Sequence, residues 1–223
     1  PPVIYTDRRR PVALLKRYPR AVLLDAGNTL ICLDFAEIGR LLADAGVSLT
    51  AGELVRAEYH GRQAVNAMVS GPGVSTDQSR AYVYFSSILK GAGVAAESIR
   101  PLFDMIRKVN EKAGLWRVVP PGAREALTRL KQSGVKLGVV SNSDGRVEAH
   151  LADAGLTEFL DFVIDSHRVG VEKPDPRIFH MGLERAGVGP HEAVYVGDLY
   201  TIDVVGARGA GADREVLQGA LQG

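Results

Sequence analysis

Short apolar strands and amphipathic helices alternate through the second half of the chain, and this alternation restricts the fold more than any other feature. After Pro120 we predict helices over 123–133, 146–154, 176–186 and 202–209, and strands over 136–140, 162–164 and 193–196. Such alternation favours right-handed crossover connections. It therefore predicts an α/β fold with a doubly wound parallel sheet that carries helices on both faces.

The first strand is predicted ahead of this region, at Ala21–Leu24, where an apolar run ends in Asp25 and turn-forming residues. From about 35 to 115 the periodicity is helical instead, and Thr50 followed by Glu53 is a capping box. We therefore predict an all-helical segment inserted just past the first strand, where doubly wound folds bind their ligands.

These patterns divide the chain into three parts. We expect a basic N-terminal lead-in over 1–19, an α/β core made of 20–34 and 116–223, and an all-helical cap over 35–115. In the weakly patterned C-terminal tail, Val216–Leu217 is the candidate for a last edge strand.

Composition restricts the classes of partner. The 223 residues carry 27 Lys and Arg against 26 Asp and Glu, and this net charge of +1 gives no general attraction to nucleic acid or to anionic membranes. The single cysteine, Cys32, excludes an internal disulfide. No apolar run approaches the roughly 18 residues of a membrane-spanning helix. We expect a cytoplasmic protein without nucleic-acid or membrane partners, and the sequence carries no signal for an oligomeric state.

Polar residues follow the predicted strands where these strands end. They are Asp25, Ser141, Asp198 with Asp203, and Lys173 in the loop after the third strand. Because the carboxyl ends of parallel strands meet in one crevice, we expect these side chains to gather there. Hard oxygen ligands suit Mg²⁺, a lysine neutralises an anionic substrate, and a free carboxylate can attack phosphorus. Any one of these residues could instead form a turn or cap a helix, but the four segments together favour phosphoryl transfer.

Four short motifs carry a resemblance to a known family. They read Leu-Leu-Asp25-Ala-Gly-Asn-Thr29-Leu, Val-Val-Ser141-Asn142, Val-Glu-Lys173-Pro174-Asp-Pro and Val-Gly-Asp198-Leu-Tyr-Thr-Ile-Asp203. In this order they resemble the haloacid dehalogenase superfamily of hydrolases over about residues 20–211. The resemblance implies a Rossmann-like core, with a helical cap inserted after the first motif.

The resemblance also implies a role for each matching residue. Asp25 would be the nucleophile, Ser141 a donor to phosphate oxygens, Lys173 the balancing cation, and Thr29 a brace for the turn, with Asn142 facing the substrate. Mg²⁺ would be held by Asp25, the main-chain carbonyl of Gly27 and Asp198, with Asp203 supporting its water shell. In the cap, Arg56 and His60 are candidate substrate contacts.

One position departs from the family pattern. Phosphatases of the family carry a second aspartate two residues after the nucleophile as general acid and base, and here that position is Gly27. Such a group contributes about 10²–10⁴-fold in rate. Its absence leaves two possibilities open for a phosphatase. Another residue supplies the proton, with His60 as one candidate, or the leaving group needs little protonation.

Two alternatives follow from the same glycine. A 2-haloacid dehalogenase needs no such proton, and Arg56 would then contact the carboxylate or halide, but these enzymes lack the metal pair that Asp198 and Asp203 form here. A weakly active protein that binds phosphorylated ligands is the other. We predict a Mg²⁺-dependent phosphohydrolase that acts on a small phosphorylated metabolite through an aspartyl-phosphate on Asp25.

Overall fold

The computed structural model describes residues 19–71, 76–211 and 213–214. The predicted basic lead-in, up to residue 18, and the predicted edge strand at Val216–Leu217 lie outside these residues. The chain forms two compact units, one built from residues up to Cys32 and from Val118 onward, and the other from Leu33–Arg117. We describe each unit by itself.

The first unit is built on a five-stranded parallel sheet with the strand order β5-β4-β1-β6-β7. Its strands are β1 (Ala21–Leu24), β4 (Lys136–Ser141), β5 (Phe162–Asp165), β6 (Ala193–Val196) and β7 (Asp213–Arg214). Every residue of β1 and β6 is buried, as expected of strands covered on both faces. The predicted parallel sheet is confirmed.

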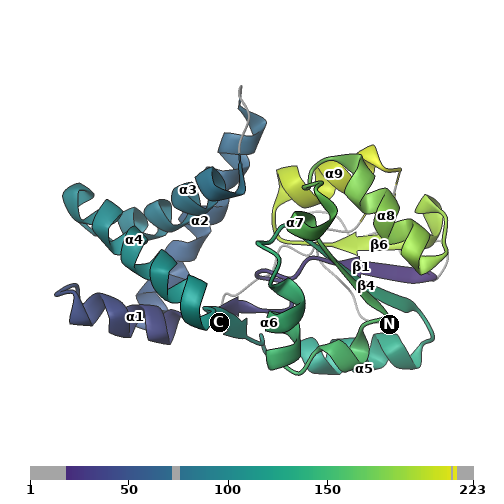
Figure 1. Ribbon diagram of the computed structural model, residues 1–223, viewed down its shortest axis with the longest axis horizontal. Helices are drawn as coiled ribbons and strands as arrows, with labels where there is room; N and C mark the ends of the chain where they lie inside the picture. The colour runs from purple at the N-terminus through teal and green to yellow at the C-terminus, as the bar shows by residue number, and fades with distance from the viewer. Residues whose placement is uncertain (1–18, 72–75, 212, 215–223) are drawn as a thin grey trace, which may run out of the picture. The chain divides into compact units, whose positions relative to one another are not determined.

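Helices cover both faces of this sheet. Figure 1 shows α5 (Ala123–Gln132) and α6 (Val147–Asp153) on one side, and α8 (Pro176–Ala186) and α9 (Val205–Gly209) on the other. Shorter turns lie between them, namely α7 (Ser166–Val169), η1 (Thr157–Phe159) and η2 (Pro190–Glu192). The chain runs outward from β1 through β4 to β5 and then returns to β6 on the other side of β1, so the topology reverses at β1. This is the doubly wound arrangement that the alternation predicts.

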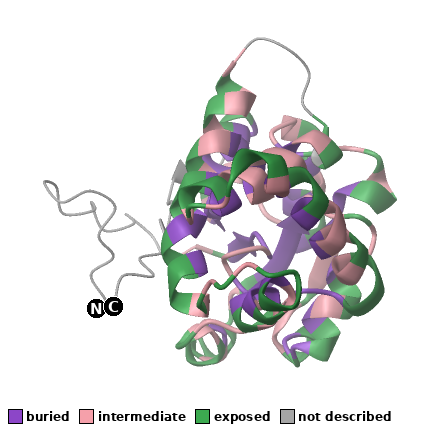
Figure 2. Ribbon diagram, turned by 90° about the vertical axis from the view of Figure 1, so that its left-hand side faces the viewer, coloured by how far each residue is buried: buried purple, intermediate pink, exposed green. Residues whose placement is uncertain are grey.

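One cluster of the apolar core packs α8 against the sheet. Buried residues are purple in Figure 2. Phe179 and Leu183 of α8 pack with Leu23 and Val140 of the sheet, and all four are nearly inaccessible to solvent. The α8 backbone comes close to the sheet at Gly182, where a Cβ atom would lie 3.0 Å from both Leu23 and Val140 side chains. The strands that carry the polar residues are therefore held in a rigid, close-packed layer.

The second unit is a group of four helices. They are α1 (Phe35–Asp44), α2 (Ala51–Ser70), α3 (Asp77–Gly91) and α4 (Ala96–Ala113). The predicted capping box starts α2: the Glu53 amide donates to Thr50 Oγ1 at 3.2 Å, and the Thr50 amide donates to Glu53 Oε2 at 2.8 Å. Gly61 lets α2 approach α3, because a Cβ there would lie 2.9 Å from the Tyr84 ring.

The chain passes between the two units through paired strands that the sequence did not indicate. β2 (Cys32–Leu33) and β3 (Trp116–Val118) form a separate two-stranded sheet. Among the helices of the described ranges, none has both the length and the apolar character needed to span a membrane.

A tight contact inside the sheet leads to a first prediction. Gly138 of β4 pairs with Phe162 of β5, and a Cβ on Gly138 would lie 2.2 Å from Phe162 Cζ. We expect Gly138→Ala to lower the free energy of unfolding by about 1–3 kcal/mol, because overpacking outweighs the entropy gained from removing a glycine. Urea unfolding measures the change.

Gly189→Ala is the matched control in the same unit, because the nearest atom to its added Cβ is Glu192 Oε2 at 3.5 Å. This variant should unfold at nearly the wild-type urea concentration. Equal stability of the Gly138→Ala protein would contradict the contact with Phe162.

Candidate active site

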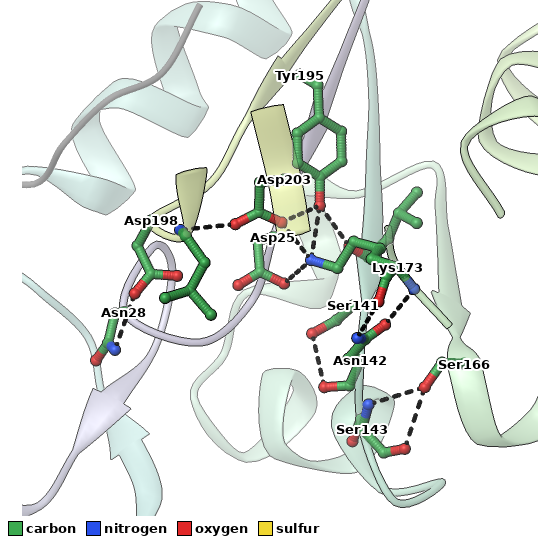
Figure 3. A network of polar contacts seen from close by, with 12 residues as sticks. Asp25, Asn28, Ser141, Asn142, Ser143, Ser166, Lys173, Tyr195, Asp198 and Asp203 are labelled. Carbon is green, nitrogen blue, oxygen red and sulfur yellow. Dashed lines mark hydrogen bonds and ion pairs between the residues drawn. The ribbon is translucent and has the colours of Figure 1, made fainter. Parts of the chain in front are cut away.

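The polar residues gather at the carboxyl ends of the three central strands (Figure 3). Asp25 follows β1, Ser141 ends β4, and Asp198 comes shortly after β6. Because β4 and β6 flank β1 at the point where the topology reverses, their ends open on the same crevice. The site thus lies at the position that the strand order alone favours.

The Lys173 ammonium is the centre of this cluster. Its Nζ donates to Asp25 Oδ1 at 2.7 Å, to Asp203 Oδ1 at 2.7 Å and to the Tyr195 hydroxyl oxygen at 2.9 Å. The three acceptors use all three N–H groups of the ammonium. The Lys173 side chain is 2% exposed, and its charge is therefore neutralised by protein groups instead of water.

Burial and charge together set the ionisation of these groups. Burial raises the pKa of Asp25 above its ordinary value; the charge of Lys173 opposes this rise and that of Asp203 adds to it. Burial alone would lower the pKa of Lys173, but Asp203 and Asp25 outweigh it and hold that pKa well above its ordinary value. Burial also raises the pKa of Tyr195. At neutral pH, Lys173 is therefore a cation and Tyr195 a neutral hydroxyl.

Three carboxylates form a cluster suited to a divalent cation. Asp25, Asp198 and Asp203 each offer an oxygen, and these oxygens lie within 4.8 Å of one another. Both oxygens of Asp203 already accept hydrogen bonds, from Lys173 at 2.7 Å and from the Leu199 amide at 2.9 Å. The donor set fits Mg²⁺, which prefers carboxylate oxygens and keeps several waters. Asp203 is therefore held by protein donors at both of its oxygens.

The turn after β1 places Asn28 against this cluster. The Ala26 carbonyl accepts hydrogen bonds from the amides of Thr29 at 3.3 Å, Leu30 at 2.9 Å and Ile31 at 3.0 Å. Asn28 has the positive φ of this turn, 52°, which asparagine tolerates better than most residues. Its side-chain amide donates to Asp198 Oδ2 at 3.1 Å. Thr29 contributes its main chain to the turn, and the left-handed position is Asn28 and not Gly27.

The loop that carries Lys173 is fixed by Asn142. The Lys173 amide donates to Asn142 Oδ1 at 2.8 Å, and Asn142 Nδ2 donates to the Lys173 carbonyl at 3.0 Å. Both polar ends of the Asn142 side chain are thus bonded to the main chain of Lys173. Its predicted contact with substrate stays a prediction, while the structure shows a contact that positions the lysine.

Buried polar groups also hold the segment after Ser141. Asp165, which is 3% exposed, accepts from the amides of Gly145 at 3.2 Å and Val147 at 3.3 Å. The neighbouring Ser166 hydroxyl accepts from the Ser143 amide at 3.1 Å. These bonds tie the loop after β4 to the end of β5, so the position of Ser141 depends on both strands.

Asp203 lies in η3 (Tyr200–Val204), a π-type helical turn that runs directly into α9, so the predicted helix over 202–209 is present with a π-type first part. Its carboxylate lies directly on Gly197, where a Cβ would come within 2.4 Å of Asp203 Cγ. Glycine is therefore required at this position for the close approach of Asp203.

The two candidate cap residues belong to the helical unit. Arg56 and His60 are both exposed on α2. The His60 ring lies against Gly91 of α3, where a Cβ would come within 2.4 Å of His60 Cδ2. His60 therefore takes part in helix packing, and contacts of either residue with substrate stay predictions.

Sequence reasoning missed Tyr195 as a member of the site. The only signal was a single phenol in the otherwise aliphatic strand Ala-Val-Tyr-Val, since a buried tyrosine hydroxyl needs a hydrogen-bond partner. The pattern did not indicate which partner that would be.

Comparison with known proteins identifies the family. The model of the haloacid dehalogenase-like hydrolases matches residues 19–211, which include every motif residue of the site. The chain belongs to the haloacid dehalogenase-like hydrolases. The resemblance read from the four motifs is confirmed.

Two curated proteins of this kind are similar to the chain in sequence. The haloacid dehalogenase-like hydrolase domain-containing protein 3 of Bos taurus is 40% identical over 129 residues, which are 57% of this chain and 51% of the relative. The glyceraldehyde 3-phosphate phosphatase of Methanothermobacter thermautotrophicus is 31% identical over 209 residues, covering 91% and 87%. The chain thus matches about half of the bovine relative and most of the archaeal one.

Among solved structures, the putative HAD-hydrolase YfnB from Bacillus subtilis, described as bound to magnesium, has a TM-score of 0.62 and 24% identity. The alignment covers 88% of this chain and 87% of that one. This likeness supports the fold of the hydrolase described here.

The buried ammonium leads to a second prediction. We expect Lys173→Met to lower the free energy of unfolding by about 3–5 kcal/mol, because it leaves Asp25 and Asp203 buried without a cation. Adding Asp203→Asn should recover part of this loss, since one of the two carboxylates is then neutral. Urea unfolding of the three proteins measures both changes.

The control is Lys136→Met, which removes an ion pair with Asp161 in which the two side chains are 57% and 33% exposed. Such a pair contributes at most about 1 kcal/mol. If both lysine variants lost the same stability, the Lys173 ammonium would not hold the site together.

Proposed function

We propose that this hydrolase is a Mg²⁺-dependent phosphatase that acts on a small phosphorylated metabolite through an aspartyl-phosphate on Asp25. The observation that carries the proposal is the Lys173 ammonium, which bonds Asp25 and Asp203 at 2.7 Å each, beside a cluster of three carboxylates. A buried carboxylate next to a fixed cation is suited to attack an anionic phosphoryl group.

In the proposed reaction, the Asp25 carboxylate attacks phosphorus, and the bond from phosphorus to the leaving oxygen breaks. Lys173 balances the charge of nucleophile and phosphoryl group, and the Ser141 hydroxyl donates to a phosphoryl oxygen. Water then attacks the aspartyl-phosphate, releasing inorganic phosphate and restoring Asp25. Held by Asp25, Asp198 and the Gly27 carbonyl, Mg²⁺ would supply charge neutralisation at the phosphoryl oxygens.

The archaeal relative, a phosphatase by name and similar over 91% of this chain, supports a small phosphate ester as substrate. Dehalogenation is the second candidate, because Gly27 offers no acid for an oxygen leaving group. The cluster of Asp25, Asp198 and Asp203 favours the phosphatase, since a carbon–halogen bond needs no divalent cation for this displacement.

The nucleophile and the metal give a third prediction. Asp25→Asn removes the attacking charge but keeps the shape, so turnover of p-nitrophenyl phosphate should fall by several orders of magnitude while the protein stays folded. Removing divalent ions with a chelator should abolish wild-type turnover, and adding Mg²⁺ should restore it.

Asp161→Asn is the control carboxylate. Asp161 lies just before the amino end of β5, whereas the site lies at the carboxyl ends of the strands, so this variant should stay active. Near wild-type turnover by Asp25→Asn would exclude the covalent mechanism. Chelator-resistant release of halide from a 2-haloacid would transfer the assignment to dehalogenation.

The glycine at position 27 gives a fourth prediction. Without an acid there, the leaving oxygen departs with little protonation, so kcat/KM should rise steeply as the pKa of the leaving group falls. Acyl and aryl phosphates should react much faster than alkyl phosphates. Gly27→Asp should flatten this dependence, and Gly27 lacks the positive φ that would strain a residue with a side chain.

Gly27→Asn is the matched control, because it adds a side chain of the same size without an acid. It should keep the steep dependence. A shallow dependence in the wild-type enzyme would show that another residue already supplies the proton, and His60→Gln would test the first candidate.

A further inference from the structure

A buried tyrosine accepts one of the hydrogen bonds of the Lys173 ammonium. Tyr195 is 3% exposed and belongs to the apolar strand β6. Its hydroxyl lies 2.9 Å from Lys173 Nζ and 2.8 Å from the Val140 carbonyl oxygen (Figure 3). We propose that Tyr195 is a positioning residue, which holds the Lys173 ammonium in place while Asp25 reacts. The kinetic part of this inference rests on the proposed function.

The direction of the hydrogen bonds follows from the chemistry of the partners. The Val140 carbonyl only accepts, and so does the nearby Asp203 Oδ1, which is 3.3 Å from the hydroxyl. The Tyr195 proton therefore points to one of these oxygens, and the phenol oxygen faces Lys173 as an acceptor. The ammonium, which only donates, fits this arrangement.

Packing fixes the tyrosine ring. The Phe179 ring of α8 meets it edge-on, with the two centroids 4.9 Å apart, and Phe179 itself is 1% exposed. The hydroxyl is bonded to a carbonyl of β4, although Tyr195 lies on β6 and β1 runs between these two strands. A ring held by a helix and by two strands is a rigid support for a flexible lysine side chain.

The three acceptors of Lys173 differ in what happens to them during the reaction. Asp25 loses its negative charge when it takes up a phosphoryl group, so its bond to the ammonium changes within each cycle. Asp203 and Tyr195 do not react, and they keep two of the three N–H groups satisfied. Because the phenol is neutral, Tyr195 adds an acceptor without adding repulsion among the carboxylates.

The first test compares two tyrosine-to-phenylalanine substitutions. Tyr195→Phe keeps the ring and removes only the hydroxyl, so we expect kcat for p-nitrophenyl phosphate to fall about 10–100-fold, because small misplacements of catalytic groups have effects of this size. KM should change less than about threefold, since the hydroxyl is buried and bonded to the lysine.

Tyr84→Phe is the control, because the Tyr84 hydroxyl donates to the buried Glu58 Oε1 at 2.7 Å and lies in the helical unit. It should lower stability without this loss of kcat. An unchanged kcat in the Tyr195→Phe enzyme would overturn the proposal, and so would an equal loss of kcat in both variants.

The second test does not depend on turnover. Tyr195→Phe should lower the urea midpoint of the otherwise wild-type protein. It should lower that midpoint much less in a Lys173→Met/Asp203→Asn background, because there the phenol oxygen has no ammonium from which to accept a hydrogen bond. An equal shift in both backgrounds would show that the hydroxyl serves only Val140 and would overturn the inference.

The two tests separate the inference from the proposed function. If the wild-type protein hydrolysed no phosphate ester, the proposed function would fail, while the unfolding comparison would still decide whether Tyr195 acts on Lys173. If the wild-type protein turned over and the unfolding shifts were equal, only the positioning role would fail.

Discussion

The Lys173 ammonium sits out of reach of water among two carboxylates and a phenol, and the rest of the site is arranged around this charge. Without the ammonium, Asp25 and Asp203 would repel each other in a region where solvent cannot screen them. With it, the charge of Lys173 opposes the rise in the pKa of Asp25 that burial causes. The loop that presents Lys173 is in turn bonded to Asn142, so the cation is held at its main chain and at its ammonium.

Each charged group is held by a separate segment of the chain, and each segment is anchored in the sheet. Asp203 lies against a glycine in the loop after β6. Asp198 accepts a hydrogen bond from Asn28 in the turn after β1, and the Lys173 main chain is bonded to the segment after β4. A small displacement of any strand would thus alter the distances among the charges. The dense packing of α8 against the sheet limits such displacements.

The sheet and most site residues were predictable because they depend on local pattern and on a topological rule. Apolar runs that end in Asp25, Ser141 or Asp198 mark parallel strands, and their carboxyl ends must meet. The pattern did not reveal β2 and β3, which contain two and three residues and are too short to show a period. It did not reveal the partner of Tyr195, because that contact joins two strands across a third and leaves no signal in neighbouring residues.

The paired strands β2 and β3 place the departure and the return of the chain beside each other. Neighbouring strands lie only about 4.8 Å apart, so the chain leaves the first unit and returns to it at adjacent positions. A hairpin turn of a few residues would join the same two ends. The helical unit is therefore an insertion whose two ends are brought together by a pair of hydrogen-bonded strands.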